Sequence, residues 1–139
     1  MRFLVFLFTT VLTAQVGTTT QQSEASIAYC FENKIEWSLI FQSSGCFHHT
    51  TEQMYISFSG DSVFLHRLIE GKEQPKILLN ADKLNVLIEF ERQLLNRTNN
   101  YGGCTTVDSY VVNSEFSSYT IKDSSCAWNG YSSLIEQIK

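Results

Sequence analysis

The sequence predicts an α+β fold, in which an antiparallel sheet of about five strands (βββ-α-ββ-α) carries helices packed on one face. Three observations support this prediction. Two groups of segments alternate apolar and polar residues, a long segment with helical spacing separates them, and a short helical pattern closes the chain. Because the strands are grouped and do not alternate singly with helices, the pattern favours antiparallel hairpins over parallel βαβ units.

The first group of strands forms a three-stranded meander. The segment Lys34–Gln42 places Ile35, Trp37, Leu39 and Phe41 on one face and polar residues on the other. The segment Gln53–Ser59 alternates in the same way, and the dipeptide Gly60-Asp61 is typical of a tight turn before a return strand at Val63–Ile69.

A long amphipathic helix is predicted over Ala81–Asn96, after the charged segment Glu70–Lys76, which contains the only proline. Asn80 is suited to cap the helix, and Asp82 is favourable in its first turn. The apolar residues that fall on one arc of this helix are Leu84, Leu87, Ile88, Phe90, Leu94 and Leu95.

A second hairpin and a short helix complete the domain. The hairpin joins Thr105–Asn113 to Phe116–Asp123, with its turn near Asn113–Glu115. The helix begins near Asn129, where apolar residues recur at helical spacing.

The N-terminus has the layout of a secretory signal peptide. Arg2 is followed by an apolar run, Phe3–Leu12, that is too short to cross a membrane, which needs about 20 residues. We expect residues 1–14 to be cleaved, with the cut as late as Gly17, residues 15–26 to form a polar tether, and residues 27–139 to form one disulfide-stabilised α+β domain. The mature chain is then secreted or periplasmic, without membrane insertion.

The charge of the chain excludes two classes of partner. Its formal net charge is −4, and Arg2 is one of the ten basic residues. No basic cluster is present, and both nucleic acids and anionic membranes require one.

Four cysteines, Cys30, Cys46, Cys104 and Cys126, predict two disulfides in an exported chain of this size. The easiest bridge to draw joins Cys104 to Cys126, because these residues flank the second hairpin. This pairing leaves Cys30 with Cys46, at the two ends of a predicted strand, so the crossed pairings stay open. The spacing is wrong for a structural zinc site.

No catalytic, metal-binding or cofactor-binding site is expected. His48, His49 and Glu52 resemble metal ligands, but adjacent histidines usually diverge. An active site would require His66, Glu91 and one of the paired histidines to converge, and we expect the chain not to be an enzyme.

Two further features allow more than one interpretation. Glu91 falls inside the apolar arc of the long helix. It is either a buried carboxylate with a raised pKa, or an acid that reaches the edge of the sheet or pairs with a base such as His66 or Arg67. Asn96-Arg97-Thr98 matches a glycosylation sequon, but one chance match is expected in this composition.

The loop Gly45–Thr50 is the candidate partner-binding element. It carries an aromatic residue and two histidines beside a cysteine, and a rigid loop with an aromatic anchor is how small inhibitors bind tightly. The candidate binding residues are Gly45, Phe47, His48 and His49. In the alternative interpretation, Phe47 turns into the core and the loop is structural.

Several short motifs together resemble a known family. They are Ser44-Gly45-Cys46-Phe47 at the end of a strand, the leucines of the long helix, the Tyr-centred hairpin Thr105–Ile121, and the ending Ser125-Cys126-Ala127-Trp128-Asn129-Gly130 after Gly102-Gly103-Cys104. The pattern is similar to the emfourin-like proteins, bacterial inhibitors of thermolysin-type metallopeptidases, and to related exported bacterial proteins of unknown role.

The resemblance implies a protein-binding module whose partner is a secreted metallopeptidase. The family pattern has a glycine where this chain has Cys46, so the fold transfers more safely than the activity. The alternative is a structural or surface protein without a site of its own.

Overall fold

The computed structural model describes residues 24–97 and 102–139, which contain ten helices and strands. Helix α2 (Ile27–Asn33) is followed by strands β1 (Trp37–Ser44), β2 (His49–Ser59), β3 (Ser62–Ile69), β4 (Lys72–Glu73) and β5 (Ile77–Leu78). Helix α3 (Ala81–Leu95), strands β6 (Val107–Ser114) and β7 (Ser118–Asp123), and helix α4 (Gly130–Ile138) complete the chain. The predicted signal peptide, residues 1–14, and residues 15–23 of the predicted tether lie outside the described residues.

The strands form one antiparallel sheet in the order β4-β3-β2-β1-β6-β7, with β5 paired to β3. The α+β class and the antiparallel sheet are confirmed, but the sheet has seven strands where about five were predicted. The two additional strands have only two residues each, too few to show an alternating pattern. They pair with β3 within and just after the charged segment Glu70–Lys76, which the sequence marks only as a break.

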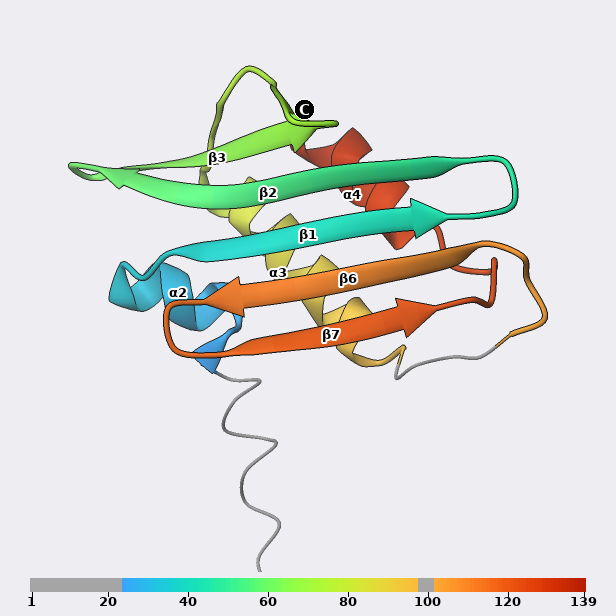
Figure 1. Cartoon of the computed structure of the whole chain (residues 1–139). Coiled ribbons are helices and arrows are strands. Elements are labelled where there is room, and N and C mark those ends of the chain that lie inside the picture. The colour runs from blue at the N-terminus through green and yellow to red at the C-terminus, as the bar shows by residue number, and fades with distance from the viewer. Residues whose placement is uncertain (1–23, 98–101) are drawn as a thin grey trace, which may run out of the picture.

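The core lies between the sheet and helices α3 and α4, which Figure 1 shows behind the strands. Alternate residues in the first five positions of β1 are buried, beginning at Trp37, and two alternate residues are buried in each of β2 and β6. These side chains join one cluster with the apolar residues of the two helices, among them Leu87, Phe90, Leu94, Tyr131, Leu134 and Ile138. Burial of each large apolar side chain contributes about 1.5–3 kcal/mol.

Helix α2 was not predicted. Ser26 caps it by accepting a hydrogen bond from the backbone N–H of Tyr29, and Lys34 ends it in a left-handed conformation with φ of 54°. Ala25, in the segment predicted to be a polar tether, is fully buried, so the folded domain begins before residue 27. The helix has only seven residues, too few for its apolar spacing to be distinguished from a strand.

The long helix was predicted to within one residue. Asn80 caps α3 as expected, because its side-chain oxygen accepts a hydrogen bond from the N–H of Lys83 at 2.9 Å. None of the described helices is long and apolar enough to cross a membrane.

One of the two disulfides is confirmed. Cys104 and Cys126 are bonded, with their Cα atoms 5.9 Å apart, and tie the segment before β6 to the segment after β7. The pairing of Cys30 with Cys46 is wrong, because both are free. Strand β1 separates them, and its eight residues span about 26 Å, far beyond the Cα separation of about 7 Å that a disulfide permits.

The ending Trp128-Asn129-Gly130 leads into α4, whose N-cap is Asn129 and whose first residue is Gly130. The indole ring of Trp128 lies directly over Gly130, so a Cβ atom at residue 130 would collide with the ring. The same ring stacks on Phe90 with centroids 5.7 Å apart, which fixes it in place.

We expect Gly130→Ala to lower the free energy of unfolding by about 1–3 kcal/mol, because the indole must move out of a packed position. Urea unfolding followed by fluorescence measures this change. Gly103→Ala is the matched control, because no atom lies within 4 Å of a Cβ atom placed there. Equal stabilities of the two variants would show that the indole shifts freely.

We expect the two free thiols to differ in reactivity. Cys46 is exposed, whereas Cys30 is buried and its pKa is raised to about 11, first by burial and then by the charge of Glu91. N-ethylmaleimide without reductant should therefore modify Cys46 in the native protein and Cys30 only in urea, as read by mass spectrometry. If neither cysteine were modified in urea, the two thiols would not be free, and a bridge between Cys30 and Cys46 would explain the result.

Candidate functional site

The β1–β2 hairpin loop, Gly45–His48, lies at the end of the sheet where β6 begins and β7 ends (Figure 1). The disulfide Cys104–Cys126 ties together the segments before β6 and after β7. The backbone N–H of Gly45 donates to the carbonyl oxygen of His48 at 2.9 Å, which leaves Cys46 and Phe47 at the tip. The side chain of Phe47 is fully exposed, with a relative accessibility of 101%. The alternative in which Phe47 packs into the core is therefore wrong.

The two histidines hold the base of this loop. His48 Nε2 lies 3.2 Å from Ser43 Oγ, and His49 Nδ1 lies 2.9 Å from Ser44 Oγ. The His48 ring also lies against Gly45, where a Cβ atom would be 2.6 Å from its Cε1 atom. Glycine at position 45 thus permits the imidazole to pack across the loop, and the bonded histidines stiffen the element that presents Phe47.

The loop residues were predicted as a group, and the structure assigns them different positions. Gly45 and His48 lie in the loop, whereas His49 is the first residue of β2 and pairs with Ser44. Strand β2 begins four residues earlier than predicted, because cross-strand pairing extends through the polar residues His49–Glu52. Phe47 is the residue of this group whose relative accessibility reaches 101%.

The suspected metal ligands do not converge. His48 and His49 contact different serines, and Glu52 accepts hydrogen bonds from Arg67 and from the Tyr131 hydroxyl, both at 2.9 Å. Within the described part of the chain, no group of three or more His, Cys, Asp or Glu side chains is arranged to hold a metal ion.

The structure also does not bring together the three side chains that an active site would require, which are those of His66, Glu91 and one of the paired histidines. His66 Nε2 lies 2.8 Å from Ser57 Oγ, and its ring stacks on Tyr55 with centroids 4.5 Å apart. Glu91 bonds to neither His66 nor Arg67, so of the interpretations left open, pairing with one of these bases is wrong.

Glu91 instead joins three elements in the core. Its side chain is 5% exposed and accepts hydrogen bonds from the backbone N–H of Ile27 and from the Tyr119 hydroxyl, both at 2.9 Å. Among the described residues, no cation forms an ion pair with it. Burial raises the pKa of Glu91 above its ordinary value, and the two hydrogen bonds offset only part of this effect.

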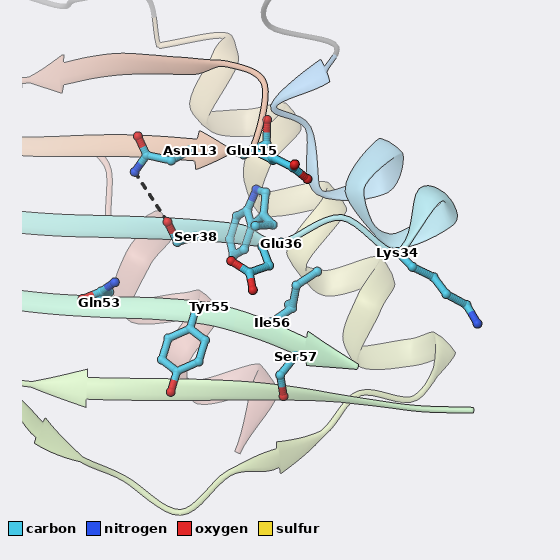
Figure 2. A pocket seen from close by; sticks show the side chains of 11 residues that line it. Lys34, Glu36, Ser38, Gln53, Tyr55, Ile56, Ser57, Asn113 and Glu115 are labelled. Atoms are coloured by element: carbon cyan, nitrogen blue, oxygen red, sulfur yellow. Dashed lines mark hydrogen bonds between the residues drawn. The ribbon is translucent and has the colours of Figure 1, made fainter. Parts of the chain in front are cut away.

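A groove that the sequence analysis missed lies at the opposite end of β1, on the sheet face that carries Ser38 (Figure 2). It has a volume of about 840 Å³. Most of its lining side chains can form hydrogen bonds, and Asn113 Nδ2 donates to Ser38 Oγ at 3.5 Å. The lining residues are Lys34, Glu36, Trp37, Ser38, Gln53, Tyr55, Ile56, Ser57, Asn113, Ser114 and Glu115.

The sequence signal for this groove was the set of polar residues that alternate with apolar ones along the strands. Ser38, Gln53 and Asn113 occupy the positions that a period of two assigns to the face away from the core. Sequence alone does not show whether a polar face of the sheet is flat or contains a groove. A groove depends on how far the neighbouring segments rise above the sheet.

No protein-family model, curated protein or solved structure matches this chain. The emfourin-like resemblance therefore rests on the sequence motifs alone.

We expect stability to fall as the pH rises from about 4 through the raised pKa of Glu91, because the folded state binds a proton that the unfolded state, with a pKa near 4.3, releases earlier. The stabilisation is complete below the unfolded pKa and lost above the folded one. Glu91→Gln should reduce this slope, as measured by urea midpoints across the pH range.

Glu89→Gln is the matched control on the same helix. Hydrogen bonds from Arg92 and Gln93 lower the pKa of the exposed Glu89 to about 2, so its contribution to the pH dependence has the opposite sign and lies mainly below its unfolded pKa near 4.3. The control should keep the full slope. An unchanged slope in Glu91→Gln would show that the carboxyl group is as well solvated in the folded chain as in the unfolded one.

Proposed function

We propose that this chain is an exported protein-binding module and that Phe47, at the tip of the β1–β2 hairpin loop, is its anchor. The observation that carries the proposal is the complete exposure of this phenyl ring on a loop whose base is hydrogen-bonded on both strands. Burial of the ring in a partner's apolar pocket would contribute about 1.5–3 kcal/mol. Little loop entropy would be lost on binding, because the loop is already ordered.

The disulfide supports the proposed location outside the cytosol. Bonds such as Cys104–Cys126 form and persist in oxidising compartments, and are rare in the cytosol. Together with the signal-peptide pattern of residues 1–14, this favours secretion or a periplasmic location.

We propose a thermolysin-type metallopeptidase as the partner to test first, because the loop motif lies in the segment that resembles the emfourin-like inhibitors. In this proposal Phe47 enters the peptidase, while Gly45 and His48 maintain the loop shape. His49 and the half-exposed Val107 pair with Ser44 from opposite sides of β1 at the loop base, and in this proposal both extend the contact.

We expect the wild-type protein at micromolar concentration to lower the residual activity of a thermolysin-type peptidase, and Phe47→Ala to weaken inhibition by at least about tenfold, because the anchor is lost. Phe116→Ala is the matched control. Phe116 is also an exposed aromatic residue, 59% accessible, but lies in the β6–β7 turn at the far end of the sheet.

Full peptidase activity with the wild-type protein would reject the inhibitor role. Equal weakening by both substitutions would reject the loop as the contact. If Phe47→Ala also left every interaction with secreted proteins intact, a structural role without a binding site would be favoured.

A further inference from the structure

The groove beside the start of β1 lies at the end of the sheet opposite the Phe47 loop, so its role is separate from the proposed function. It is formed by side chains from three neighbouring strands, β2, β1 and β6, and by the segments that enter β1 and leave β6. Figure 2 shows the side chains that line it and the strands from which they come. The question is which ligand its chemistry fits.

Hydrogen-bonding groups dominate this surface. Ser38 offers a hydroxyl, Gln53 and Asn113 offer amides, and Glu36 and Glu115 offer carboxylates. Amides and hydroxyls both donate and accept, and carboxylates accept. A ligand that carries several hydroxyl groups on adjacent carbons matches such a mixed set, because each of its hydroxyls can donate one hydrogen bond and accept others.

Tyr55 gives the groove an aromatic surface in a fixed position. The His66 ring stacks on Tyr55 at an interplanar angle of 3°, and the imidazole is itself held by Ser57. His66 does not line the groove, so Tyr55 contributes ring surface that His66 leaves uncovered. A fixed aromatic surface next to hydroxyl and amide groups fits a sugar ring, whose C–H groups lie on its faces and whose hydroxyls lie around its rim.

The charge of the lining residues restricts the class of ligand further. Among the described residues, neither Glu36 nor Glu115 forms an ion pair, and Figure 2 shows Lys34 directed away from both. Two unneutralised carboxylates repel phosphate, sulfate and uronate groups. Anionic ligands are therefore disfavoured.

An extended peptide fits less well. The apolar lining residues Trp37 and Ile56 are each only 2% exposed, so the groove lacks an apolar pocket for a peptide side chain.

We propose that this groove binds a non-acidic saccharide. Tyr55 stacks on one face of a sugar ring, and Gln53, Asn113 and Glu36 form hydrogen bonds with its hydroxyls. Ser57 and His66 act as positioning residues, because they hold the Tyr55 ring without contacting the sugar.

The test is a titration of the full domain with maltotetraose, cellotetraose and chitotetraose, each to about 10 mM, a range that detects weak binding. Amide and side-chain NMR shifts report both affinity and place. We expect saturable shifts at Gln53, Tyr55 and Asn113 with at least one sugar, and affinity about tenfold lower in Tyr55→Ala. Tyr29→Ala, a half-exposed tyrosine on α2, is the matched control and should bind normally.

Tyr55→Phe separates the ring from the hydroxyl and should retain most of the affinity. Ser57→Ala should weaken binding less than Tyr55→Ala, because it loosens the ring without removing it. The proposal is overturned if none of the three sugars gives saturable shifts, if the shifts lie outside the groove, or if an arginine-containing peptide competes for the same residues more tightly than every sugar.

Discussion

The whole arrangement depends on strand β1, which is paired along its length with β2 on one side and β6 on the other. Because side chains alternate across it, the strand presents Trp37, Leu39 and Phe41 to the helices and Ser38 to the opposite face. Pairing on both sides holds this central strand extended. It therefore fixes how far apart its two ends lie, and with them the hairpin loop that follows it and the groove beside its start.

Elements with strong periodicity could be predicted from the sequence, and elements decided by tertiary pairing could not. The alternation in β1 and the capped apolar arc of α3 are local signals, and both are confirmed. Strands β4 and β5 exist because β3 offers backbone groups for pairing, which no local pattern reports. Helix α2 is short and is stabilised by contacts remote in sequence, among them the hydrogen bond from Ile27 to Glu91.

The candidate sites also combine features that the sequence could predict with features that depend on tertiary structure. The exposed aromatic residue at position 47 could be suspected from its neighbours, but sequence could not decide whether the ring faced water or the core. The histidines stay predicted partner contacts, and sequence could not show that their ring nitrogens also bond to the serines at the loop base. The groove combines residues more than seventy positions apart, such as Ser38 and Asn113, and only the β1–β6 register brings them together.

The two outer edges of the sheet differ in a way that limits self-association. Beyond β3 the edge is covered by two strands of two residues each, with Pro75 between them, whereas β7 forms the other border with six residues. Short strands and proline discourage edge-to-edge pairing. If two copies paired through β7 about a two-fold axis, the outer edges of the joined sheet would be the β4 and β5 sides of both copies. Because these edges pair poorly, assembly would stop at the dimer and no fibril would form.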